Sequence, residues 1–387
     1  MEKSNFADSL KAIFVCSFDT RLGNVLEWQY PREVNLDKIE FKALASCLHL
    51  TQYDLVYFNH NGMFGLAAFK TLVINDSKER NVRMKSVGLI SKSYESLKEF
   101  YNFLAHQVKV QLDNPGVYVH LESFWSNKII NENEFLILKY NKLDIISNEQ
   151  SKNLLSLLFD KRLRLFKDLD VRTEFNEKIY LKCALFYGPS LFIIWKYLLL
   201  NKRIMIYSQP PVINLCLRLM CLFEMLKCDV FDFKLFDPKP YFYVSVVDID
   251  QLSEESSYIA CTTEKIFESK QNLFDLYIDN SEILCVNSNN RKQSLKPNSL
   301  DKKRSDTLID LLMNSNEQDQ QVFLNFFKDL NSKIFNQLEE TQSMQNQNEN
   351  KNLLTDQLIR KMDLDPSDDR DFLNSLIRLH NFTIKFF

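Results

Sequence analysis

The chain has 387 residues, a length that suggests two or three domains. Of these residues, 45% are hydrophobic and 26% are charged, which is ordinary for a folded protein. Its 48 basic and 51 acidic residues leave a formal net charge of −3, too little positive charge to hold nucleic acid. The longest apolar segment, residues 185–200, is broken by Gly188-Pro189 and Lys196 and is too short to cross a bilayer. The first ten residues carry charges and no apolar stretch of a secretory signal. We therefore expect a cytoplasmic protein with no integral membrane segment and no nucleic-acid partner.

Residues 1–125 have the pattern of one α/β module. Apolar runs of strand length alternate with turn sequences, and two segments have helical spacing. Asn35 is placed to cap the first helix and Ser93 the second, which Asn114-Pro115-Gly116 ends. The expected order β-β-α-β-β-β-α consists of strands at 12–18, 25–30, 54–58, 64–72 and 83–90, with helices at 36–48 and after Ser93.

A second α/β module is expected at residues 179–280, after a linker at 126–178 that contains one docking helix near 152–166. Strands that alternate with helices are typical of a layered α/β domain. The helix at 212–227 is apolar nearly all round, which predicts that it is buried. The remaining predicted elements are a helix at 191–200 and strands at 202–208, 241–248, 257–261 and 276–279.

Residues 281–387 change in composition and predict a helical part. Residues 287–301 are polar and predict a disordered loop, and a second polar tract covers 341–352. Residues 363–369 resemble the start of a calcium-binding loop, but Asp368 stands where such a loop needs Gly. We interpret this segment as a helix-to-helix turn. Helices are expected at 305–313, 320–340, 355–362 and 368–379.

Motifs for covalent chemistry and for cofactors are absent from the sequence. The six glycines form no GxxxxGK[ST] or GxGxxG motif, so the chain is not expected to bind its own nucleotide through a phosphate loop. There is no GxSxG or HExxH motif, although a triad assembled through the fold stays open. The eight cysteines form no CxxC pair and lie mostly in apolar runs, which indicates reduced, buried thiols. We expect no metal, no cofactor and no covalent catalysis.

Several stretches, in the same order along most of the chain, carry a resemblance to a known family. In the first module they are 18–28 (FDTRLGNVLEW) with Pro31, 84–88 (MKSVG) and 114–116 (NPG). In the second they are 195–208 (WKYLLLNKRIMIYS) with 210–212 (PPV), 239–244 (KPYFYV) and 258–268 (YIACTTEKIFE). Near the end they are 364–366 (LDP) and 369–373 (DRDFL). With these motifs the chain resembles DENN-domain proteins of the LCHN type.

The resemblance implies a longin-like N-terminal module (1–125), a central DENN α/β module (179–280) and a helical C-terminal part. It also implies a partner, a Rab-family small GTPase held in a groove between the first two modules. DENN-domain proteins loosen the switch regions of the GTPase, so that GDP leaves and GTP enters. The protein would then be a guanine nucleotide exchange factor in membrane trafficking, and any recruitment to a membrane would come through its partner.

Seven residues are candidates for contact with the GTPase, and each has a structural alternative. Lys202 and Arg203 are placed to reach an acidic surface or to cap the preceding helix. Asp19 and Arg21 lie in a turn whose chemistry explains them equally well. Thr262, Thr263 and Glu264 resemble a helix N-terminal cap, and their role in binding rests on the resemblance alone.

Three functions are compatible with this reading. The first is exchange activity, and the second is a GTPase-binding adaptor or scaffold without exchange, because one fold supports both. The third is a GTPase-activating protein, which needs an arginine finger. Arg21, Arg203 and Arg218 are arginines of the two modules, but none stands out and Arg218 falls in the helix predicted to be buried.

Overall fold

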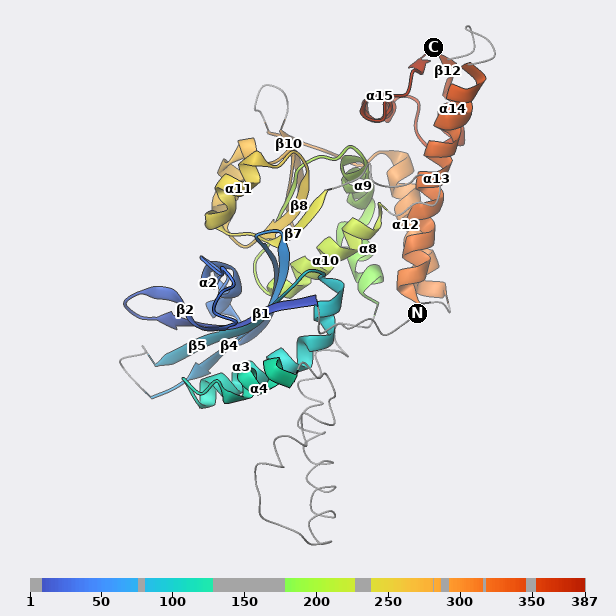
Figure 1. Cartoon of the computed structure of the whole chain (residues 1–387). Helices are drawn as coiled ribbons and strands as arrows, with labels where there is room; N and C mark the ends of the chain where they lie inside the picture. The colour runs from blue at the N-terminus through green and yellow to red at the C-terminus, as the bar shows by residue number, and fades with distance from the viewer. Residues whose placement is uncertain are drawn as a thin grey trace. The chain divides into compact units, whose positions relative to one another are not determined.

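Figure 1 shows the computed structural model of the chain, which describes residues 9–75, 81–127, 178–226, 238–280, 282–286, 292–315, 318–345 and 353–386. The chain divides into two compact units. The N-terminal unit comprises Met1–Leu44 and Leu48–Glu177, and the C-terminal unit comprises Ala45–Cys47 and Lys178–Phe387. Both combine sheets with helices, which confirms the α/β class. The docking helix predicted near 152–166 lies outside the described residues, and the longin-like arrangement stays a prediction.

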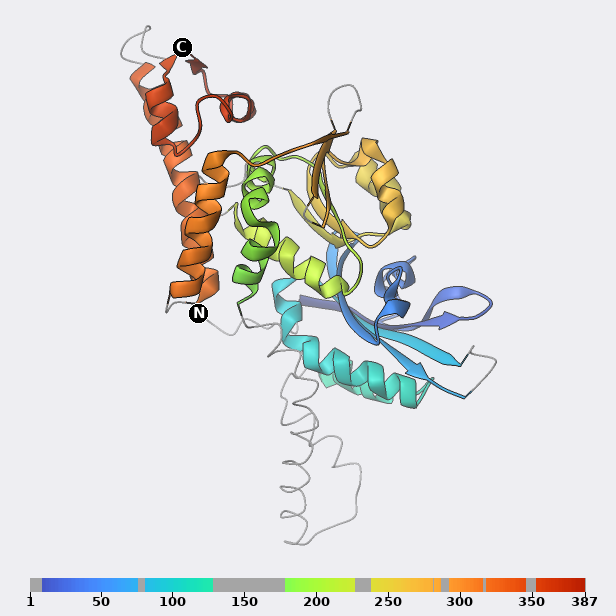
Figure 2. The same cartoon turned by 180° about the vertical axis from the view of Figure 1, so that it is seen from behind.

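The N-terminal unit is built on an antiparallel sheet with the strand order β3-β4-β5-β1-β2. Helices α3 (Tyr101–Asp113) and α4 (Val119–Asn127) lie along one face in both views, and α3 contacts β4 and β5 (Figures 1 and 2). The predicted order of strands and helices is confirmed. The strands are β1 (Leu10–Asp19), β2 (Gly23–Tyr30), β3 (Tyr53–His60), β4 (Met63–Val73) and β5 (Val82–Ser91).

Two expectations about helices in this unit are wrong. The helix predicted at 36–48 is only α2 (Glu40–Ala43) with a short 3-10 turn, η1 (Leu48–Leu50). The Asn35 side chain accepts a hydrogen bond from the amide of Asp37 at 2.9 Å, and Lys38 has a φ of +64°, so the backbone leaves the helical path before α2. Ser93 does not cap α3, because the 3-10 helix η3 (Glu95–Phe100) lies between them.

The C-terminal unit contains a mixed sheet with the order β11-β10-β9-β6-β8-β7. Strands β7, β8, β6 and β9 are parallel, so their carboxyl ends lie at one edge of the sheet. Strand β10 pairs antiparallel with β9, and β11 pairs antiparallel with β10. Helix α10 (Val212–Glu224) packs on β7 and β8. Helix α11 (Ile249–Glu254), with the 3-10 helices η6 (Lys265–Ser269) and η7 (Gln271–Leu273), contributes to an apolar core that includes Met205 and Tyr277. The strands are β6 (Ile204–Tyr207), β7 (Lys239–Tyr243), β8 (Tyr258–Thr262), β9 (Leu276–Asp279), β10 (Glu282–Val286) and β11 (Lys292–Ser294).

Further helices complete the C-terminal unit (Figure 2). The disordered loop predicted at 287–301 is wrong in its second half, where β11 and the start of α12 lie. Asn298 and Asp301 form a capping box that starts α12 well before the predicted residue 305. Helix α10 is not wholly buried, since Asn214 is exposed and Arg218 is half-buried. The helices are α8 (Ile179–Tyr187), α9 (Leu191–Leu199), α12 (Ser299–Asn314), α13 (Asp319–Gln345), α14 (Asp356–Lys361) and α15 (Arg370–Leu379).

Candidate functional site

The carboxyl edge of the parallel strands in the C-terminal unit carries Thr262, Thr263 and Glu264. Both threonines are buried, and the Thr262 hydroxyl accepts a hydrogen bond from the amide of Glu264 at 3.1 Å. The Glu264 carboxylate accepts hydrogen bonds from the Ser46 hydroxyl at 2.6 Å and from the amide of Val246 at 2.9 Å. Burial raises the pKa of Glu264 despite these hydrogen bonds. Thr262 ends β8, and Thr263 and Glu264 connect it to η6. The helix N-terminal cap expected for these three residues is wrong, because no side chain caps η6.

Apolar and charged side chains surround Glu264 at this edge. Val246, whose amide donates to Glu264, and Ile266, two residues after Glu264, are about half exposed. The Lys265 ammonium donates to the Asp279 carboxylate at 2.7 Å and lies 5.0 Å from the centre of the Tyr207 ring. In open α/β sheets, ligands bind outside the carboxyl ends of the strands.

Lys202 and Arg203 lie at the opposite edge, before β6. The Arg203 guanidinium pairs with Asp275 at 3.2 Å and donates to the carbonyl of Asn272 at 2.7 Å, while its backbone amide donates to Asp275 at 2.9 Å. These bonds hold the start of β6 beside the start of β9. Lys202 is exposed, and its amide donates to the carbonyl of Tyr197 at the end of α9.

The two groups of candidates in the C-terminal unit are therefore not brought together. Residues 202–203 and 262–264 are separated by the length of the sheet, about 13 Å for four extended residues. Sequence reasoning missed this separation because it did not assign the parallel register of β6 and β8, in which Ile204 lies opposite Ile259 and Tyr207 opposite Thr262.

Asp19 and Arg21 lie at the tip of the β1–β2 hairpin in the N-terminal unit. The Asp19 carboxylate accepts hydrogen bonds from the amides of Leu22 at 2.8 Å and Arg21 at 2.7 Å, which lower its pKa. Turn chemistry thus accounts for Asp19, as the structural alternative predicts. Arg21 is exposed beside Leu22, which is 78% exposed, and contact of this tip with a partner stays a prediction.

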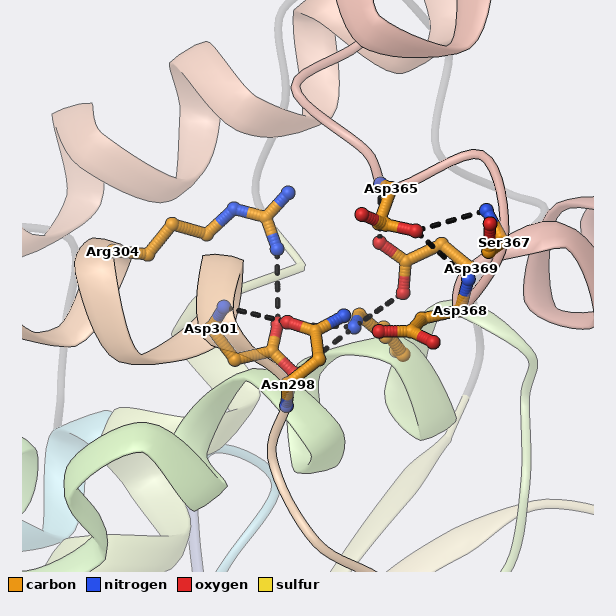
Figure 3. Close-up of polar contacts among 8 residues, drawn as sticks. Asn298, Asp301, Arg304, Asp365, Ser367, Asp368 and Asp369 are labelled. Atoms are coloured by element: carbon orange, nitrogen blue, oxygen red, sulfur yellow. Dashed lines mark hydrogen bonds and ion pairs between the residues drawn. The ribbon is translucent and has the colours of Figure 1, made fainter. Parts of the chain in front are cut away.

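A buried charge network in the C-terminal unit was not predicted from the sequence (Figure 3). The Lys196 ammonium of α9 bridges two carboxylates, at 3.0 Å from Asp301 and 2.6 Å from Asp369. Arg304 pairs with Asp301 at 3.0 Å. Asp301 and Asp369 are almost wholly buried, and the two cations balance their charge. The signal was present, because a lysine inside the apolar segment 191–199 has to find a carboxylate when it is buried.

Arg304 has an unusual environment within this network. Among the described residues, its buried Nε and Nη2 atoms have no hydrogen-bond partner. The guanidinium carbon instead lies 5.7 Å and 5.8 Å from the ring centres of Trp195 and Phe192. Attraction between the cation and these ring faces compensates in part for the missing hydrogen bonds.

The acidic segment 363–369 is the turn between α14 and α15, as predicted. The Asp365 carboxylate accepts hydrogen bonds from the amides of Ser367 and Asp368, both at 2.9 Å, which lower its pKa (Figure 3). The amide of Asp365 in turn donates to Asp369 at 2.9 Å. In the part of the chain that the structure describes, no three His, Cys, Asp or Glu side chains are grouped so that they could hold a metal ion.

Comparison with known proteins decides the family. A model of the family described as DENN domain-containing protein 11 matches residues 13–290. This chain belongs to the DENN domain-containing protein 11 family. The family member from Xenopus laevis is 36% identical over 97% of this chain and 85% of its own length, and the member from Danio rerio is 34% identical over 97% and 76%. A yeast protein, the uncharacterized protein ANR2 of Saccharomyces cerevisiae, is 26% identical over 70% of this chain and 57% of its own length.

Membership of the DENN domain-containing protein 11 family confirms the resemblance found in the sequence. Lys196 and Asp369 come from two of the stretches that carried it, 195–208 and 369–373, and the structure shows that they meet in one ion pair. Among the described residues, none of the helices has the length and the apolar character needed to cross a membrane.

Proposed function

We propose that this protein is a guanine nucleotide exchange factor for a Rab-type small GTPase. The observation that carries the proposal is the family match over residues 13–290, because DENN-domain proteins generally act as Rab exchange factors. Exchange needs no covalent step by the factor, which agrees with a sequence that has no motif for covalent catalysis.

The mechanism follows from differential binding. A factor that binds the nucleotide-free GTPase more tightly than the GDP-bound form must weaken GDP binding by the same ratio. Each tenfold preference corresponds to about 1.4 kcal/mol. The chain therefore has to supply surfaces that fit the GTPase best when its nucleotide is absent, and it needs no side chain that reacts.

The candidate contact residues differ in the exposure of their side chains to solvent. Arg21 and Lys202 are exposed, so we assign them direct contact with the GTPase. Glu264 is bonded to the amide of the exposed Val246 and lies two residues before the exposed Ile266, so we propose that this edge offers an apolar contact beside a carboxylate. Thr262 and Thr263 are buried and Arg203 is paired with Asp275, so we propose that these three support the contact residues.

The test is the release of fluorescent GDP from a panel of purified Rab GTPases, with and without this protein. Lys202→Glu and Arg21→Glu reverse exposed charges without removing a structural ion pair. Lys303→Glu is the matched control, because Lys303 is an exposed lysine of the C-terminal unit that lies on α12, outside the proposed contacts. Arg203 is left intact, since its loss would expose Asp275 unpaired.

Acceleration for one or a few Rabs, reduced by either contact variant and kept in the control, is the expected result. Binding to a nucleotide-free GTPase without acceleration would favour the adaptor alternative. Faster GTP hydrolysis would favour the activating role, for which Arg218 is a poor finger because its guanidinium lies 3.5 Å over the Phe186 ring. Absence of binding to every member of the panel would contradict the proposal.

A further inference from the structure

In the C-terminal unit, the two ends of the segment 353–386 pair with each other. Strand β12 (Leu353–Leu354) pairs in parallel with β13 (Lys385–Phe386), with Leu353 opposite Lys385 and Leu354 opposite Phe386. Paired strands lie about 4.8 Å apart, so the two ends of residues 353–386 meet. Helices α14 and α15 and the Asp365 turn lie between these ends. We call residues 353–386 the C-terminal strap.

The strap carries buried apolar side chains, and its helix α14 contacts α13. Ile359 and Met362 from the end of α14, Leu364 from the turn and Leu373 and Leu376 from α15 are buried. The side chain of Thr355 caps α14, and the hydrogen bonds around Asp365 and Asp369 fix the turn. These bonds lie within the strap, so they do not depend on its contact with the rest of the unit.

The strap also contacts α9 and α13. The Phe372 ring lies 6.2 Å from the ring of Trp195, and the His380 ring lies 5.5 Å from that of Phe335. Asp363 lies 3.7 Å from the Lys333 ammonium in a largely exposed pair. Asp369 and Lys196 form a buried ion pair at 2.6 Å.

The Lys196 pair can separate without leaving a buried charge alone. A buried ion pair is normally costly to break, because the partner left behind is unpaired in a poorly solvated place. Here Lys196 would keep Asp301, which also keeps Arg304. Asp369 would keep the amide of Asp365 and would enter water with the strap. Both sides of the break therefore retain a partner.

We propose that the C-terminal strap opens and closes as one unit, with the Lys196–Asp369 pair as its latch. Opening removes the Phe372 ring from the indole of Trp195, which is fully buried in the closed state. The device is independent of the proposed exchange activity.

Hydrogen exchange of the full chain, followed by mass spectrometry, tests the proposal. In the wild-type protein, α14 and α15 should share one opening free energy, lower than that of α9 and α12. Asp369→Asn removes the latch charge and should raise exchange about tenfold or more across the whole strap, α14 included, because the ion pair to Lys196 is lost. Asp368→Asn makes the same charge change at an exposed neighbour and should leave exchange unchanged.

Two results would overturn the proposal. Faster exchange confined to the residues around 369 would indicate local fraying of α15. An equal increase in α9, α12 and the strap would indicate loss of the whole unit. Should Asp369→Asn fail to fold, the wild-type measurement decides by itself, since different opening free energies for α14 and α15 exclude a single opening unit.

Discussion

The Asp19 hairpin tip of the N-terminal unit and the Arg203 and Lys196 pairs of the C-terminal unit hold their charged groups in place over different distances along the chain. In the N-terminal unit, Asp19 binds amides two and three residues away. In the C-terminal unit, Arg203 pairs with a residue 72 positions away and Lys196 with one 173 positions away. Parallel strands require crossover connections, so neighbours in a parallel sheet are distant in sequence, whereas a hairpin brings neighbours together directly. The comparison indicates that substitution of Lys196 or Arg203 should separate distant segments, whereas substitution of Asp19 should have a local effect.

The sharpest test of long-range attachment is Asn331→Ala in α13. The Asn331 side chain accepts a hydrogen bond from the Trp195 indole and donates one to the carbonyl of Met225, both at 2.8 Å and both buried. The alanine leaves two buried groups without these partners, so we expect a loss of about 2–4 kcal/mol in the free energy of unfolding. Urea denaturation measures this loss of free energy, and hydrogen exchange of α9 shows its effect on that helix. Asn325→Ala, at an exposed position of the same helix, should change stability little, and an equal loss there would contradict the explanation.

A long-range pair in the N-terminal unit provides the second test. Tyr118 donates to the Glu27 carboxylate at 2.6 Å, and Lys85 pairs with it 58 residues away. Burial raises the pKa of Glu27, but the hydrogen bonds and the Lys85 charge outweigh it and lower the pKa below its usual 4.5. A carboxyl with a lowered folded pKa stabilises the fold above its unfolded pKa and loses that contribution as the pH falls through the folded value.

We therefore expect the stability of the N-terminal unit to fall as the pH decreases below about 4.5. Glu27→Gln should cost about 1–2 kcal/mol at neutral pH and should reduce this acid sensitivity. Denaturation of both proteins from pH 7 to pH 3, followed by exchange in β1 and β2, makes the comparison. An unchanged pH profile in the variant would show that other carboxyls determine acid stability.

The same contrast explains how much of the structure was predictable. The strands from Leu10 to Ser91 follow from apolar runs and turn sequences, and all five were predicted within a few residues. The helix expected at 36–48 failed because Asn35 forms a local turn and Lys38 takes a left-handed conformation, neither of which changes apolar periodicity. Similarly, the start of α12 was missed because its first turn is polar and only the Asn298–Asp301 capping box marks it.

The candidate contacts were predictable as residue types but not as a site. Motifs indicated Lys202, Arg203 and Glu264, yet their places at opposite edges of the sheet depend on parallel register, which periodicity does not contain. The two carboxylates that pair with Lys196 could not be identified from the sequence either. The sequence shows that a lysine within an apolar helix needs a carboxylate, but Asp301 and Asp369 could be assigned only from the fold.

The smallest expected effect tests whether an ion pair with a less exposed cation is stronger than one with a more exposed cation. Arg203 and Asp275 are 23% and 33% exposed, so a double-mutant cycle with Arg203→Met and Asp275→Asn should give a coupling of about 0.5–1 kcal/mol. Lys265 and Asp279 are closer in sequence, but Lys265 is 59% exposed, and their coupling should be weaker. Equal couplings would mean that solvent screening does not separate the two pairs. A stronger Lys265–Asp279 coupling would reverse the comparison, because the more local pair would then contribute more to the C-terminal unit than the pair that joins β6 to β9.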